Sequence, residues 1–245
     1  MSGWQQRVSA VLILLILGLT VARANRASAR PAAAGDFAAI DAYVAAQMDE
    51  LRVPGLALGI VQGDQIVYLK GYGVANPAGD PVTAQMPFSI GSLTKSFTAL
   101  AIMQLVEAGR LELDAPVRRY LPWFQVADDS ASLNITLRHL LTHTAGLPRD
   151  LASSGAPEDE QRPERLEARL RGLRAVELEQ PLGTYGYSNA GYMVLAMVIQ
   201  QVTGQSYEAY VGKQIFAPLG MSRSFGSLDA ARRRRPGRAA GRPCG

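Results

Sequence analysis

Only one stretch of the chain has the pattern of β-strands, and this limits the folds open to it. Residues 56–61 and 65–70 are short apolar runs separated by Gly63-Asp64, which is typical of a tight hairpin turn. A helix is predicted before the hairpin, over residues 36–52, and the apolar spacing is helical from about residue 80 onward. A two-stranded hairpin is at best marginally stable alone and needs further strands or a helix to pack against. We therefore predict an α+β protein with a helical region and one antiparallel hairpin.

Ser92 and Lys95 are the first candidates for catalysis. The chain has 3 Lys against 22 Arg, and one of these Lys residues follows a Ser by three positions. Arg keeps its proton in a protein, whereas burial can tune a Lys amine to act as a base. Residues 93–108 are predicted to form a helix ended by Gly109, which places both side chains on one face at its N-terminus. They are either an activated nucleophile with its base or a helix cap followed by a solvated Lys.

Tyr187 and Asn189 form a second candidate site. They stand one residue apart, directly before a predicted helix over residues 189–202 that Gly204 ends. A phenol at such a loop tip can move a proton when neighbouring positive charge lowers its pKa, and an Asn amide can hold a substrate carbonyl or a Lys amine. The simpler interpretation is a helix cap provided by Ser188 or Asn189.

The order Ser92-x-x-Lys95, then Tyr187-x-Asn189, resembles the serine β-lactamase and penicillin-binding-protein superfamily. It is most similar to the class C β-lactamase-related serine hydrolases. The similarity runs over about residues 37–227. It includes Val53-Pro54-Gly55-Leu56, Gly71-Tyr72-Gly73, the stretch Leu-Leu-Thr-His-Thr-Ala-Gly-Leu-Pro at 140–148, and Ile-Phe-Ala-Pro-Leu-Gly-Met at 215–221. The resemblance implies a β-lactamase/transpeptidase-like fold.

The resemblance also implies a mechanism. Ser92 would attack an amide, ester or β-lactam carbonyl and form an acyl-enzyme, with its backbone N–H as one oxyanion donor. Tyr187 and Lys95 would handle the proton, and which of them is the acylation base stays open because coupled groups titrate together. Asn189 would bind the substrate. No cofactor and no metal are expected.

The third motif of this superfamily, Lys-Thr-Gly or a variant on a downstream strand, has no counterpart here. The nearest similar sequence, Val202-Thr203-Gly204, lacks a cation and is predicted to end a helix. We therefore expect residues 36–228 to be an incomplete β-lactamase-related domain, with only the N-terminal helix and first hairpin of its sheet, truncated at the C-terminus. A truncated, catalytically impaired fragment and a non-enzymatic binder of cell-wall peptides or penicillin are the alternatives to an active hydrolase.

Residues 229–245 are predicted to be a disordered, Arg-rich tail. The last fifteen residues carry six Arg and no acid, so the net charge of +4 arises there. Such a segment cannot form a core. It is either a basic tail that binds anionic lipid or cell-wall polymer, or the product of a frameshift.

The N-terminus has the form of an export signal. A basic region with Arg7, an apolar run over residues 11–22 and a small-x-small sequence predict a signal peptide over 1–24 and a linker over 25–35. The protein is expected to be periplasmic or extracellular, and an uncleaved membrane anchor is the alternative. We expect a small-molecule or peptide substrate, no nucleic acid, and a monomer. His139 and His143 have a spacing that suits a metal, but no third His exists and a structural role is expected.

Overall fold

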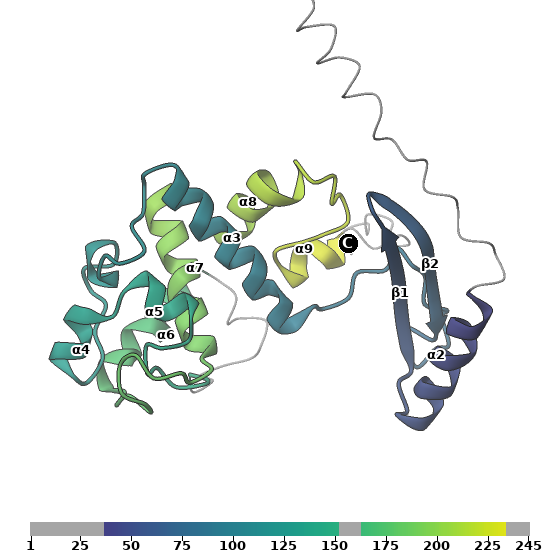
Figure 1. Cartoon of the computed structure of the whole chain (residues 1–245), viewed down its shortest axis with the longest axis horizontal. Helices are drawn as coiled ribbons and strands as arrows, with labels where there is room; N and C mark the ends of the chain where they lie inside the picture. Colours follow the sequence, from purple (N-terminus) through teal and green to yellow (C-terminus); the bar gives the residue numbers. More distant parts are fainter. Residues whose placement is uncertain (1–36, 152–162, 234–245) are drawn as a thin grey trace, which may run out of the picture. The chain divides into compact units, whose positions relative to one another are not determined.

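The computed structural model describes residues 37–151 and 163–233 and divides into two compact units, residues 1–86 and 87–245 (Figure 1). Unit 1 holds a helix and the hairpin, and unit 2 is helical. The α+β prediction is confirmed. The residues predicted to form one domain, 36–228, are shared between these two units.

Unit 1 consists of α2 (Ala38–Glu50) followed by the antiparallel strands β1 (Gly55–Gln62) and β2 (Gln65–Gly73). The predicted hairpin is confirmed, with its turn at Gly63, where φ is +62°. Strand β2 extends beyond residue 70 because Gly71 pairs with Ala57 and Gly73 pairs with Gly55. A Cβ atom on Gly71 would collide with the backbone carbonyl of Val82, so the chain can pass there only as glycine.

A carboxylate fixes α2 to β2. Asp41 accepts hydrogen bonds from the hydroxyls of Tyr68 and Tyr72 and from Lys70, whose Nζ lies 2.7 Å from Asp41 Oδ2. The Lys70 and tyrosine hydrogen bonds lower the pKa of Asp41 to about 2. The tyrosines come from alternate positions of β2, which point to one face of the hairpin.

Unit 2 is built around α7, which contacts four other helices of the unit. The helices of unit 2 are α3 (Thr94–Glu107), α4 (Asp129–Asn134), α5 (Leu137–Leu141), α6 (Pro163–Arg171), α7 (Asn189–Thr203), α8 (Tyr207–Val211) and α9 (Leu228–Arg233). Helix α7 packs against α3, α5, α6 and α8, and Figure 1 shows it crossing α3. Seven of its residues are buried, which fits the apolar sequence of this segment: Ala190, Gly191, Val194, Leu195, Met197, Val198 and Ile199.

The two helices that carry the predicted site have the predicted bounds to within a residue or two. Gly109 and Gly204 lie just after α3 and α7 with φ of +68°, the left-handed conformation that ends helices. Because Gly204 caps α7, the Val-Thr-Gly sequence at 202–204 ends a helix as expected.

The charged segment that contains α6 also contributes to the core, because Leu170 and Leu173 are fully buried there. The segment predicted to be a disordered tail, residues 229–245, instead begins in a helix, because α9 includes residues 229–233. The Ser227 hydroxyl accepts a hydrogen bond from Ala230 N–H, and the Ala and Arg residues that follow are good helix formers.

The predicted signal peptide and linker, and the rest of the Arg-rich segment, lie outside the described residues. Within residues 37–151 and 163–233, no helix has the length and apolar character needed to span a bilayer.

Candidate active site

Ser92 lies in a 3₁₀ turn, η1 (Gly91–Leu93), that leads directly into α3. Its side chain is exposed, and neither η1 nor α3 has a side-chain cap at its N-terminus. The preceding residue, Gly91, has a φ of +52°, which favours glycine. The interpretation of Ser92 as a helix cap is therefore wrong, and its hydroxyl is directed to other side chains.

Lys95 lies in the first turn of α3, on the same face as Ser92. Its Nζ is 3.4 Å from Ser92 Oγ and donates a 2.5 Å hydrogen bond to Asn189 Oδ1. The side chain is half-buried. Lys95 is therefore not a solvated first-turn Lys, since its ammonium joins α3 to the start of α7.

Ser188 is the cap of α7, and it sets the direction of its two neighbours. Its hydroxyl accepts a 3.0 Å hydrogen bond from Gly191 N–H and donates a 2.7 Å bond to the carbonyl of Pro148, and its side chain is buried. With Ser188 turned inward, Tyr187 and Asn189 lie on either side of it and reach the Ser92 region. Ser188 is therefore the cap that the simpler interpretation predicted, while the side chains of Tyr187 and Asn189 are left to face Ser92 and Lys95.

Tyr187 makes the shortest contact to Ser92, with 2.6 Å between Tyr187 Oη and Ser92 Oγ. Two cations face its ring: Lys95 Nζ lies 4.9 Å from the ring centroid and the Arg149 guanidinium 5.0 Å from it. Hydrogen bonding to Lys95 and Ser92 lowers the pKa of Tyr187 below its ordinary value, and the charges of Lys95 and Arg149 act in the same direction. The Tyr187 phenol therefore ionises more readily than an ordinary tyrosine.

His143 supports the Tyr187 ring. The two ring centroids are 4.6 Å apart with 30° between the planes. His143 Nδ1 accepts a 3.1 Å hydrogen bond from Ser188 N–H, so the ring proton must be on Nε2. Burial and the Lys95 charge lower the pKa of His143, which favours this neutral form.

The two histidines have separate structural roles. His139 Nδ1 accepts a hydrogen bond from the backbone N–H of Thr136, and the Thr136 hydroxyl accepts one from the backbone N–H of His139. Together these two hydrogen bonds cap α5. In the described part of the chain, no group of three or more His, Cys, Asp or Glu side chains could hold a metal. The expected structural role of this pair is in agreement with these contacts.

Arg149 and Asp150 were missed by the sequence predictions. They follow the Gly-Leu-Pro at 146–148, and the Arg149 carbonyl accepts a 2.7 Å hydrogen bond from Asn189 N–H. Asp150 Oδ1 accepts a 2.6 Å bond from Asn189 Nδ2. No short motif marks these residues, and only the conformation of the loop brings them to the site.

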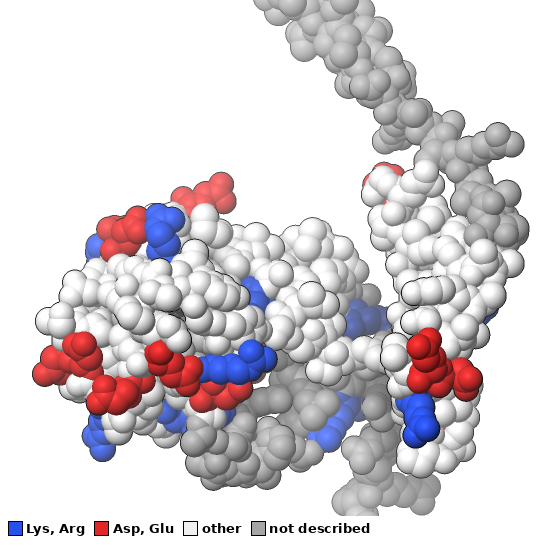
Figure 2. Space-filling model, turned by 60° about the horizontal axis from the view of Figure 1, so that its bottom comes forward, with Lys and Arg blue, Asp and Glu red and all other residues white. Residues whose placement is uncertain are grey.

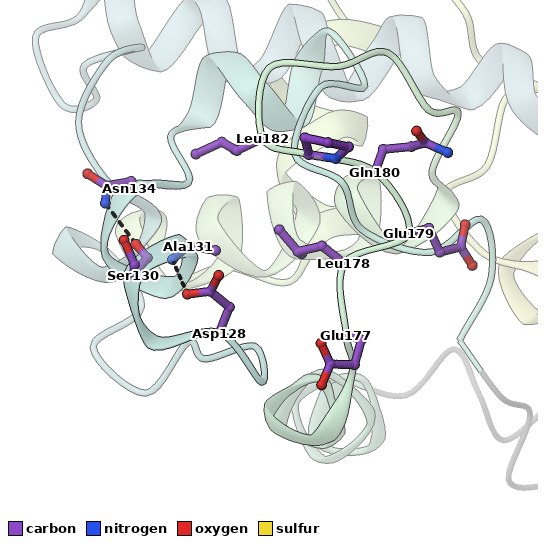
Figure 3. Close-up of a pocket in the computed structure, with 10 residues that line it drawn as sticks. Asp128, Ser130, Ala131, Asn134, Glu177, Leu178, Glu179, Gln180 and Leu182 are labelled. Carbon is purple, nitrogen blue, oxygen red and sulfur yellow. Dashed lines mark hydrogen bonds between the residues drawn. The ribbon is translucent and has the colours of Figure 1, made fainter.

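A separate hollow on unit 2, of about 430 Å³, includes none of these residues. Figure 3 shows that carboxylates of Asp128, Glu177 and Glu179 line it, together with Asn134 and Gln180. One Asp128 oxygen accepts a hydrogen bond from Ala131 N–H and caps α4. The face of unit 2 seen in Figure 2 carries acidic and basic side chains next to one another.

The chain is similar to several known proteins. A family model described as Beta-lactamase matches residues 40–243. Protein flp of Staphylococcus aureus (strain N315) is 32% identical over 188 residues, which cover 75% of this chain and 37% of flp. The octameric penicillin-binding protein homologue from Pyrococcus abyssi is 34% identical, with a TM-score of 0.69 over 82% of this chain and 46% of the other. A class C beta lactamase from Rhodobacter sphaeroides is 31% identical, with a TM-score of 0.59 over 74% of this chain and 48% of the other.

The chain thus spans less than half the length of each of these three relatives. The matches cover both the hairpin and the helical region, and the predicted β-lactamase/transpeptidase-like fold is confirmed.

Proposed function

The chain belongs to the beta-lactamase family, within the serine β-lactamase and penicillin-binding-protein superfamily, and from this premise we propose that it is a serine hydrolase that forms an acyl-enzyme on Ser92. One observation carries the proposal: Ser92 Oγ is 2.6 Å from Tyr187 Oη, while Lys95 Nζ lies near both. An exposed Ser beside a phenol of lowered pKa and an ammonium is an activated nucleophile.

Tyr187 is the better candidate for the base in acylation. Its oxygen lies at a hydrogen-bonding distance from Ser92 Oγ, whereas the 3.4 Å contact of Lys95 is long for a proton transfer. The Lys95 ammonium stabilises the phenolate that results when Tyr187 ionises. Lys95 therefore acts on the proton transfer through Tyr187.

The steps follow from this assignment. The Tyr187 phenolate takes the proton of Ser92 as Oγ forms a bond to the carbonyl carbon, and the carbonyl oxygen takes the negative charge near the Ser92 backbone N–H. The bond to the leaving group then breaks, and Tyr187 returns the proton to that group. In the second half, Tyr187 takes a proton from water, the hydroxide attacks the acyl carbon, and Ser92 Oγ leaves with the proton.

We propose an amide, an ester or a β-lactam as substrate. Ser92 is exposed, so the attacked carbonyl can come from a small molecule or a peptide. We also propose that the protein is exported by the predicted signal over residues 1–24 and acts outside the cytoplasm. We propose in addition that it is a monomer.

A second candidate is stoichiometric acylation without turnover, as expected of a penicillin binder. The observation that favours it is the similarity of this chain, at 34% identity, to a protein described as a penicillin-binding protein homologue. Acylation needs only the Ser92 and Tyr187 pair. Turnover also needs a water molecule that reaches the acyl carbon.

Both candidates are tested by hydrolysis of a chromogenic ester and a chromogenic cephalosporin. The variants are Ser92→Ala and, as a matched control, Ser96→Ala, which removes an exposed hydroxyl from the adjacent first turn of α3. We expect steady turnover with wild type and Ser96→Ala and none with Ser92→Ala. One equivalent of product followed by no turnover supports the second candidate, and equal rates for all three proteins would exclude both.

A further inference from the structure

A chain of hydrogen bonds runs from the loop after α5 to the Lys95 ammonium. Lys95 Nζ donates to Asn189 Oδ1 at 2.5 Å, and Asn189 Nδ2 donates to Asp150 Oδ1 at 2.6 Å. We propose that Asp150 is a positioning residue for the serine hydrolase site: it fixes the Asn189 amide with its oxygen toward Lys95. This inference rests on the proposed function only in what it says about acylation.

The chemistry of the three groups allows one arrangement. An ammonium group only donates hydrogen bonds and an ionised carboxylate only accepts them, while an Asn amide does one at each end. With Lys95 on one side and Asp150 on the other, the Asn189 oxygen must face Lys95. In the rotated arrangement, N–H groups would face the ammonium and the amide oxygen would face the carboxylate.

Without Asp150, this constraint on Asn189 is lost. Water can then satisfy either end of the amide, because the contact to Asp150 lies at the surface. Each rotated amide leaves Lys95 without its 2.5 Å acceptor. The ammonium then loses its fixed place 4.9 Å from the Tyr187 ring.

Other charged and titratable groups also surround Tyr187. The test must distinguish their effects on Tyr187 from the effect of Asp150. Lys95 and Arg149 face its ring, and His143 stacks against it with a neutral imidazole. The Tyr192 ring also contacts His143, with 5.1 Å between the two ring centroids. Asp150 Oδ2 lies 3.8 Å from Arg149 Nε, so removing its charge also changes the surroundings of Arg149.

The size of the effect is limited by exposure. The Asp150 side chain is 65% exposed, so water competes for its hydrogen bond. For Asp150→Ala we expect a fall of about ten-fold in the acylation rate, the scale of one hydrogen bond to a charged group. Asp150→Asn can still accept from Asn189 Nδ2 through its own amide oxygen, and we expect its rate to stay within about three-fold of wild type.

The experiment compares Asp150→Ala and Asp150→Asn with Asp129→Asn, which neutralises an exposed Asp at the start of α4. Titration of Tyr187 by ¹³C NMR of labelled tyrosine Cζ, assigned with Tyr187→Phe, reports the position of Lys95 without any substrate. We expect a higher Tyr187 midpoint in Asp150→Ala and an almost unchanged one in Asp150→Asn and Asp129→Asn.

Two results would overturn the inference. If both Asp150 variants shift the midpoint downward by the same amount, Asp150 acts by its charge alone. If the midpoint of Asp150→Ala equals that of wild type, Asn189 needs no partner to hold Lys95. Thermal unfolding of each variant shows whether the fold is intact.

The rate of Ser92 labelling by a fluorophosphonate separates this inference from the proposed function. A wild type that is not labelled contradicts the proposed function, while the Tyr187 midpoints still decide the role of Asp150. A labelled wild type with the expected order of variants, Asp150→Ala slower than Asp150→Asn, supports both.

Discussion

Replacing Tyr187 with Phe tests the assignment of the base with the least disturbance of the site. The substitution removes only the oxygen that lies 2.6 Å from Ser92 Oγ. The ring keeps its contact with His143 at 4.6 Å and its contacts with Lys95 and Arg149. We therefore expect a folded protein whose thermal midpoint is close to that of wild type.

The loss of the base should slow acylation by about 10²–10⁴-fold, the usual contribution of a positioned general base. The pH dependence should change as well. In wild type the rate of acylation should rise with pH as Tyr187 ionises, with a midpoint below the ordinary value of about 10 because the pKa of Tyr187 is lowered. This rise is absent from Tyr187→Phe.

The assay is the rate of Ser92 labelling by a fluorophosphonate, followed over a series of pH values. Tyr185→Phe is the matched control, since Tyr185 is 67% exposed and its ring contacts His143 edge-on at 6.2 Å. It should be labelled at the wild-type rate. A Tyr187→Phe protein that keeps the wild-type rate and pH profile would refute the assignment of Tyr187 as the base.

Three further predictions concern the stability of the fold. Ser188→Ala removes a buried cap of α7 and should lower the free energy of unfolding by about 1–2 kcal/mol, measured by denaturant unfolding. The pKa of Asp41 is lowered to about 2, below its unfolded value of about 4, so its contribution to stability is complete above pH 4 and is lost as the pH falls through 2; Asp41→Asn should remove this dependence from acid unfolding curves. Gly146→Ala should destabilise the protein by more than about 1 kcal/mol, because φ is +70° there and a Cβ would meet the carbonyl oxygen of Gln180. Gly109→Ala, with a similar φ of +68° and open space around it, should cost less in the same measurement.

The core of the site could be predicted from the sequence because its residues come in short motifs. Ser92 and Lys95 share one face of a helix start, and Tyr187 and Asn189 share one loop tip, so local spacing alone pairs them. The structure brings the two pairs together across 95 residues, with Tyr187 on Ser92 and Asn189 on Lys95.

Arg149 and Asp150 could not be predicted, because they carry no local signal. An exposed Arg-Asp pair in a charged segment has many equivalent interpretations. Their position depends on the Pro148 carbonyl, which accepts from Ser188, and on the Arg149 carbonyl, which accepts from Asn189 N–H. These are contacts between distant segments that no residue spacing shows.

The fold was predicted best where the apolar pattern is strong. Helix α7, with its apolar sequence, has the predicted bounds to within one residue. The segment that contains α6 carries a weaker apolar pattern, because charged residues surround the two leucines, Leu170 and Leu173, that are buried in the core. A weak apolar signal of this kind depends on tertiary contacts.

One measurement tests the central claim most directly: the mass of the protein after reaction with a fluorophosphonate, followed by location of the adduct. Tryptic cleavage after Lys70 and Lys95 yields the peptide 71–95, in which fragmentation distinguishes Ser92 from Ser89. We predict a single adduct on Ser92 in the wild-type protein and no adduct on Ser92→Ala. An adduct on another residue, or equal labelling of Ser92→Ala, would contradict the account of Ser92 as the nucleophile.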